Sequence, residues 1–92
     1  MTAHSALESQ IKKYLTYRGW LCISTHGSRN HPEEAGIPDL LCIIAGRVRA
    51  VEVKILPGKV SKAQERFHEV LRAHGAIVTV VNSLDDMMEE MP

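Results

Sequence analysis

Apolar residues in the first part of the chain recur at helical spacing. Between Ser5 and Arg18 they form one stripe, made of Leu7, Ile11, Tyr14 and Leu15. Ser5 is a suitable N-cap, and Glu8 lies three residues further on, which is the spacing of a capping box. Gly19 suits the end of the helix. We therefore predict a helix over residues 5–18, in which Glu8 caps the helix, faces solvent or reaches inward.

A second helical pattern begins at Ser61. Ser61 and Gln64 form another capping box, and Gly75 is a clean stop. The expected inner stripe consists of Phe67, Val70, Leu71 and His74. Packing or a surface position explains His68 and His74 better than a role as catalytic bases.

Four other segments are apolar and rich in β-branched residues, which predicts strands over residues 20–25, 39–45, 47–55 and 76–81. The last of these is an unbroken apolar run and is predicted to be a buried strand. Ser83 is expected to cap a short acidic helix over residues 84–90. The element order is α-β-β-β-α-β-α, and the strand–helix–strand unit should return parallel to its first strand. The pattern predicts an α/β fold with a mixed sheet covered by helices on both sides.

The two middle strands form a hairpin whose register can be worked out from the sequence. A two-residue loop at Ala45-Gly46 places Asp39 opposite Glu52, and a loop one residue further on places it opposite Lys54. Either pairing puts all three charged residues on one face, with opposed Cβ atoms about 5 Å apart. A three-residue loop would split the group. Two-residue loops are the commonest hairpin connection, so we predict that the three charges cluster.

Such a cluster favours one kind of chemistry. Buried charged groups usually pair or bind a metal, and two carboxylates at a sheet edge suit Mg²⁺ or Mn²⁺. The ion can polarise a phosphate, while Lys54 orients the attacking water or stabilises developing charge. Gln64 can help to position that water, or can serve only as a capping residue. The alternative to metal-assisted phosphodiester hydrolysis is structural, with Asp39 as a strand-entry turn residue and Glu52-x-Lys54 as a solvated strand pattern.

The polar segment over residues 26–36 leads into Asp39 and is predicted to be a loop overhanging it. Its Ser28, Arg29 and Asn30 can donate to phosphate oxygens, although a solvated loop explains them equally well. Formal net charge is zero, which alone argues against a nucleic-acid partner. Residues 1–84, however, hold eleven Lys and Arg against seven Asp and Glu, which leaves a modestly basic surface.

Length and composition fit one small globular domain, with 92 residues of which 45% are hydrophobic and 24% charged. No apolar run reaches the roughly 18 residues of a membrane span, and the N-terminus lacks a signal-peptide pattern. Two cysteines are too few for a disulfide scaffold. Cys22, His26 and His31 fall only at loose zinc-ligand spacing. We expect a reducing cytoplasmic setting, which would be the host cytoplasm for a viral protein, and no membrane partner.

Three motifs together resemble the PD-(D/E)xK nuclease superfamily, and most of all its VRR-NUC group, the virus-type replication–repair nucleases. They are Gly36-x-Pro38-Asp39, Glu52-x-Lys54 and Ser61-x-x-Gln64. The resemblance covers nearly the whole chain. It implies a single nuclease domain over residues 1–92, built on a restriction-endonuclease-like core with a mixed four-stranded sheet flanked by helices.

The resemblance also implies roles for individual residues. Asp39 and Glu52 would be metal ligands, with the Val53 carbonyl as a third, and Lys54 would be the catalytic lysine. Gln64 matches the family's helix glutamine. Glu8 matches its N-terminal glutamate, which is a further candidate ligand and catalytic residue. The candidate DNA contacts are Ser28, Arg29, Asn30, Lys59 and Lys62.

The expected activity is that of a Mg²⁺- or Mn²⁺-dependent DNA endonuclease, selective for branched DNA such as Holliday junctions. A homodimer is expected, because two symmetric nicks need two sites. Two alternatives remain open. The chain can be a nuclease-fold DNA-binding or interaction module without activity, or a sequence-specific restriction nuclease, for which it leaves little room for a recognition insert.

Overall fold

The computed structural model describes residues 2–25 and 35–91. Its elements in chain order are α1 (Ala3–Tyr17), β1 (Leu21–Ser24), β2 (Leu40–Ile44), β3 (Arg47–Val53), α2 (Lys62–Ala73), β4 (Ile77–Val81) and α3 (Leu84–Glu90). The strands form one sheet in the order β1-β2-β3-β4, in which β3 and β4 run parallel and the other neighbours run antiparallel. The predicted element order, the mixed four-stranded sheet and the parallel return of β4 are confirmed.

The hairpin between β2 and β3 has the two-residue loop that the sequence favoured. Ile44 pairs with Arg47, and the intervening Ala45 and Gly46 have φ angles of 47° and 78°. Two positive φ values are typical of a type I′ turn, whose twist matches that of the flanking strands. Leu40 pairs with Val51. The residue before Leu40 therefore lies opposite Glu52, and the register that clusters the charges is confirmed.

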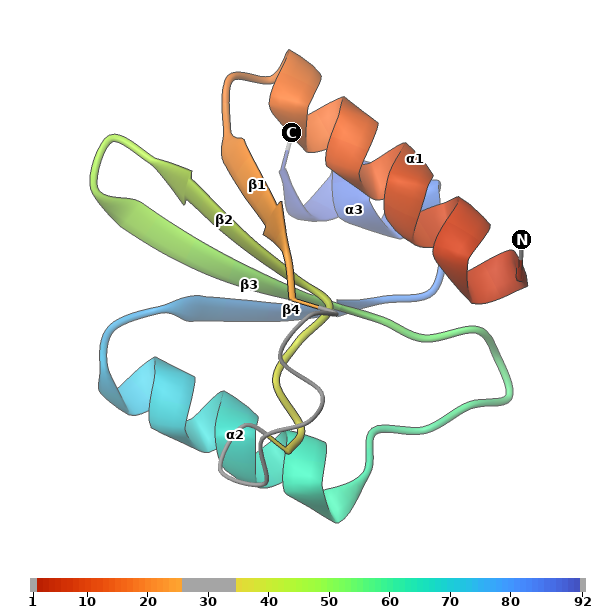
Figure 1. Cartoon of the computed structure of the whole chain (residues 1–92), viewed down its shortest axis with the longest axis vertical. Helices are drawn as coiled ribbons and strands as arrows, with labels where there is room; N and C mark the ends of the chain where they lie inside the picture. The colour runs from red at the N-terminus through yellow and green to blue at the C-terminus, as the bar shows by residue number, and fades with distance from the viewer. Residues whose placement is uncertain (1, 26–34, 92) are drawn as a thin grey trace.

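The helices lie in two layers around the sheet. Figure 1 shows α1 and α3 together on one side and α2 on the other. The core fills the space between the sheet and the first pair of helices, and its fully buried members include Ile11, Leu15, Leu40, Cys42, Val51, Val53, Val81 and Met87. The C-terminal end of the described chain is fastened to α1, because Tyr14 Oη and Arg18 Nη1 both donate to the Met91 carbonyl, at 3.1 and 2.9 Å.

The α2 layer covers its side of the sheet less completely than predicted. Ala50 and Glu52 are buried beneath it, but Leu21 and Ile23 on the same face of β1 are 61% and 46% exposed. β4 is the last strand in the sheet, and Ile77 and Val80, which lie on its opposite faces, are both exposed, so the prediction of a buried strand is wrong.

Two expectations about the helices also need correction. In α2 the buried residue is His68, whereas Val70 is 54% exposed and His74 is exposed. The inner face of α2 therefore includes His68, and Val70 and His74, which were predicted to face inward, do not belong to it. The helix α1 begins earlier than predicted. Its N-cap is Thr2, and Ser5 is the third helical residue, not the cap. None of the helices in the described ranges is long and apolar enough to cross a membrane.

Candidate active site

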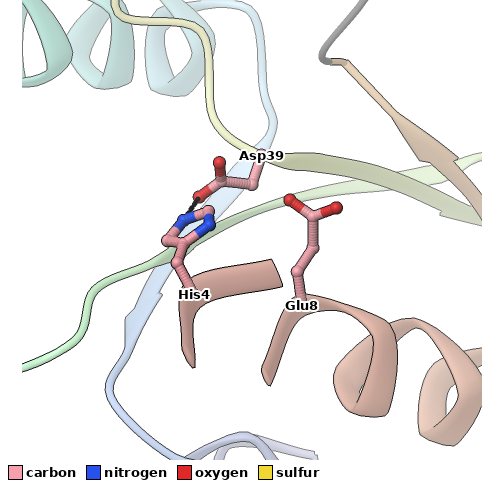
Figure 2. Close-up of side chains that lie close together, drawn as sticks. All are labelled: His4, Glu8 and Asp39. Carbon is pink, nitrogen blue, oxygen red and sulfur yellow. Dashed lines mark hydrogen bonds and ion pairs between the residues drawn. The ribbon is translucent and has the colours of Figure 1, made fainter. Parts of the chain in front are cut away.

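The first two turns of α1 contribute two side chains to one end of the sheet. Thr2 and Ser5 form a reciprocal capping box, which fixes where the helix starts. His4 and Glu8 lie four residues apart and therefore share one face of the helix. Figure 2 shows both side chains directed toward Asp39. Because the true cap is Thr2, Glu8 is released from the capping role that the sequence offered it, and it is buried with 9% exposure.

Asp39 is held by the strands on both sides of it. The Thr25 backbone N–H donates to the Asp39 carbonyl at 3.1 Å, and the Thr25 hydroxyl donates to the carbonyl of buried Pro38. The Asp39 side chain in turn accepts from the Val53 backbone N–H, with 2.9 Å between Oδ2 and the nitrogen. These contacts fix the Asp39 carboxylate at the start of β2, where the residue is buried.

His4, Glu8 and Asp39 bring three donor atoms together. One imidazole nitrogen and one oxygen from each carboxylate all lie within 4.8 Å of one another. His4 Nε2 lies 3.3 Å from Asp39 Oδ2 and 3.1 Å from the Val53 carbonyl oxygen. The Val53 carbonyl is therefore directed into the same space. Nitrogen, carboxylate and carbonyl donors around one point form a set that can hold a divalent cation.

Glu52 completes the acidic group from the other side of Asp39. Burial, a hydrogen bond to Asp39 and the negative charge of Asp39 raise the pKa of Glu52 from 4.5 to about 8. Its Oε1 lies 3.4 Å from Nε2 of His68, another buried side chain. Burial, followed by the charge of Arg72, lowers the pKa of His68. Near neutral pH and without a bound cation, the contact between Glu52 and His68 therefore joins two uncharged groups and is not an ion pair.

Lys54 lies on the Glu52 side of the cluster. Its backbone N–H continues the β3–β4 ladder to the Val81 carbonyl at 2.9 Å. Its positive charge lowers the pKa of both Glu52 and His68, which places it near both groups. The structure thus brings Glu8, Asp39, Glu52, Val53 and Lys54 to one end of the sheet.

The structure gives a different outcome for each of the remaining predicted residues. Gln64 makes the capping box expected of it, with 2.8 Å between its Oε1 and the Ser61 backbone nitrogen. Lys59 and Lys62 are exposed, in the segment from β3 to α2 and at the start of α2. Ser28, Arg29 and Asn30 lie outside the described residues.

Sequence reasoning missed two histidines at this site. His4 precedes the predicted start of the first helix, and a four-residue spacing places two side chains on one face only when both belong to the helix. The N-cap at Thr2 makes His4 part of α1 and so aligns it with Glu8. His68 follows Gln64 by four residues and Phe67 by one. A stripe drawn through residues 64, 68 and 71 would have directed it toward the sheet.

A mixed four-stranded sheet flanked by helices, with buried carboxylates gathered at one end, defines an α/β protein with a nuclease-like fold.

The comparisons with known proteins give the family. The family model described as VRR-NUC domain matches residues 6–85. A solved structure titled "VRR_NUC domain" superposes with a TM-score of 0.77 at 31% sequence identity, and each chain is covered over 100% of its length. A search of the curated proteins gives no match. The chain belongs to the VRR-NUC family of nucleases.

Proposed function

We propose that this chain is a divalent-metal-dependent DNA endonuclease that hydrolyses phosphodiester bonds, with a preference for branched DNA such as Holliday junctions. The observation that carries the proposal is the convergence of Glu8, Asp39, Glu52 and Lys54 at one end of the sheet. Membership of the VRR-NUC family supports it, because nucleases of this type act on DNA and usually need a metal.

The donor set fits a hard divalent cation. Asp39, Glu8 and the Val53 carbonyl face one space, and Glu52 shares a hydrogen bond with Asp39. Mg²⁺ and Mn²⁺ both bind carboxylate and carbonyl oxygens. We propose Asp39, Glu52 and the Val53 carbonyl as ligands, with Glu8 beside them. When bound, the cation polarises the phosphate and lowers the pKa of a coordinated water.

The protein's own residues supply the rest of the chemistry. Glu52 must give up the proton that its raised pKa retains before it can act as a ligand, so cation binding near neutral pH would release a proton. The Lys54 ammonium group is close enough to Glu52 for its charge to lower the pKa of that carboxyl, and it can donate to a phosphate oxygen on which negative charge develops. We propose that Gln64 assists through its amide nitrogen, because its capping contact uses only the oxygen.

The partner and the assembly are part of the same proposal. The exposed Lys59 and Lys62, together with Ser28, Arg29 and Asn30, are the proposed contacts to DNA phosphates. A homodimer would present two sites to the two strands of a junction. The exposed apolar side chains on the outer strand β1, described above, offer a surface on which two copies could pack.

A cleavage assay tests the proposal directly. Supercoiled plasmid and a synthetic four-way junction are incubated with the wild-type protein in Mg²⁺, in Mn²⁺ and in EDTA. The matched variants are Asp39→Asn and Asp85→Asn, the latter an exposed carboxylate in α3. We expect cation-dependent cleavage, faster on the junction. Asp39→Asn should lose at least about 100-fold in rate, and Asp85→Asn should keep wild-type activity.

Two results would contradict the proposal. If the wild type cleaves neither substrate with either cation, and DNA binding is the same for wild type and Asp39→Asn, the chain is a binding module with a nuclease fold. If Asp39→Asn cleaves as fast as the wild type, the activity does not come from this cluster.

A further inference from the structure

His4 belongs to the donor cluster but to none of the family motifs in the sequence. Its Nε2 lies 3.1 Å from the Val53 oxygen and 3.3 Å from Asp39 Oδ2. Adjacent ligands of an octahedral ion bound at about 2.1 Å lie about 3 Å apart. The separations around His4 are therefore those of neighbouring ligands on one cation, and they also suit a hydrogen bond from the imidazole N–H.

The fold holds His4 in this position before any cation arrives. The Thr2–Ser5 box fixes the first turn of α1, and the four-residue spacing aligns His4 with Glu8. Neutral imidazole can carry its proton on Nδ1 and offer the Nε2 lone pair to a metal, so coordination needs no movement of the helix. The His4 side chain is 35% exposed, against 9% for that of Asp39, which leaves the cluster open to solvent on the histidine side.

We propose that His4 is a ligand of the divalent cation and that its nitrogen makes the site prefer Mn²⁺ to Mg²⁺. The inference rests on the proposed function, since it concerns the same cation. Mg²⁺ binds oxygen ligands almost exclusively, whereas imidazole is a good ligand for first-row transition metals. A site of carboxylates and one carbonyl discriminates weakly between the two ions. Adding one nitrogen at ligand distance strengthens binding of Mn²⁺ selectively.

The test measures binding, separately from cleavage. Pulsed electron paramagnetic resonance of bound Mn²⁺ detects ¹⁴N coupling when an imidazole nitrogen is directly coordinated. Titration calorimetry gives the Mn²⁺ and Mg²⁺ affinities. We expect ¹⁴N coupling in the wild type and its loss in His4→Ala. The same variant should bind Mn²⁺ about tenfold more weakly or worse, with a smaller change for Mg²⁺.

Two further variants separate coordination from simpler roles. His4→Gln keeps a hydrogen-bond donor but has no imidazole nitrogen, so it should behave like His4→Ala in the ¹⁴N measurement. His74→Ala removes an exposed histidine at the far end of α2 and should keep the coupling and both affinities. Circular dichroism confirms that each variant is folded.

The outcomes distinguish the inference from the function on which it rests. Coupling that survives in His4→Ala, or an unchanged ratio of Mn²⁺ to Mg²⁺ affinity, overturns the role of His4. Mn²⁺ binding that Asp39→Asn abolishes, but that shows no ¹⁴N coupling in the wild type, refutes the inference and leaves the proposed function standing. A wild-type protein that binds no Mn²⁺ overturns both.

Discussion

The most informative perturbation is Glu52→Gln, because the structure predicts that it stabilises the metal-free protein while removing a ligand. Glu52 is 2% exposed and adjoins the Asp39 carboxylate, so its ionised form is disfavoured in the native state. Glutamine has nearly the same shape, carries no charge at any pH, and can still donate a hydrogen bond to Asp39. The variant should therefore avoid the cost of ionising a buried carboxyl group.

The magnitude follows from the raised pKa. The native state holds the Glu52 proton up to a pKa of about 8, whereas the unfolded chain releases it near 4.5. Protonation therefore favours the native state. This contribution is fully present below pH 4.5 and is lost as the pH rises to 8, at about 1.4 kcal/mol for each pH unit. The full loss is on the order of 4 to 5 kcal/mol, which is a large part of the 5–15 kcal/mol typical of a folded domain.

Urea unfolding in EDTA at pH 5.5, 7 and 8.5 measures this difference. The free energy of unfolding of Glu52→Gln should exceed that of the wild type by about 3 kcal/mol or more at pH 8.5, and by much less at pH 5.5. Glu69→Gln, an exposed carboxylate on α2, is the control and should follow the wild type. With saturating Mn²⁺ the order should reverse, because only the wild type gains the full binding energy of the cation.

Parallel pH profiles for the wild type and Glu52→Gln would refute this reasoning. They would mean that the Glu52 carboxylate ionises in the native state at no cost, with its charge balanced by Lys54. Because both proteins share every other titrating group, the difference between the two profiles isolates the carboxyl group at this position.

Three further predictions test the surroundings of the cluster. Gly36→Ala should destabilise the protein by at least about 2 kcal/mol more than Gly46→Ala in urea melts. Both glycines have positive φ, but only at position 36 would the new Cβ meet backbone, 2.3 Å from the Ala63 oxygen. Equal losses would contradict the close packing. Lys54→Met should slow cleavage at least about 100-fold, while calorimetry should show an Mn²⁺ affinity within a few-fold of that of the wild type. If the variant instead loses Mn²⁺ affinity but cleaves at the wild-type rate when saturated with the ion, Lys54 takes no part in the reaction. Lys59→Ala and Lys62→Ala should each lower the salt dependence of DNA binding, the slope of log K against log salt, by about 1; unchanged slopes would exclude these phosphate contacts.

The sequence predicted the hairpin and its charges because their positions depend on local rules. Strand residues alternate in direction, and Gly46 admits a two-residue turn, so the clustering of the charges followed from the chain alone, although two registers stayed open. Either register placed Asp39, Glu52 and Lys54 together, and the structure has the one that pairs Leu40 with Val51. No tertiary information was needed, since all three residues lie on one continuous hairpin.

The histidines could not be predicted in the same way, because their roles depend on where helices begin and which face they bury. Ser5 is a good cap by composition, yet the chain uses Thr2 and places Ser5 inside the helix. Starting the helix three residues earlier brings His4 into its first turn, one turn before Glu8 and on the same face. His68 faces Glu52 because α2 lies over β3 and β4 on that side of the sheet. The apolar residue Val70 in the same helix had suggested that a different face of α2 is buried.

The glycine in the first motif shows how a sequence pattern can record packing between distant segments. Gly36 has a φ of 89°, and a Cβ there would lie 2.8 Å from the Gln64 nitrogen and closer still to Ala63. The segment that delivers Asp39 therefore passes directly against the first turn of α2, where Gln64 caps the helix. Gly36-x-Pro38-Asp39 and Ser61-x-x-Gln64 are thus two sides of one contact. A side chain at position 36 would push α2 away from the sheet, and with it His68 away from Glu52. Glycine at position 36 therefore lets the segment that carries Asp39 pack closely against α2, which keeps His68 next to Glu52. This constraint acts through the backbone, so the catalytic side chains alone do not reveal it.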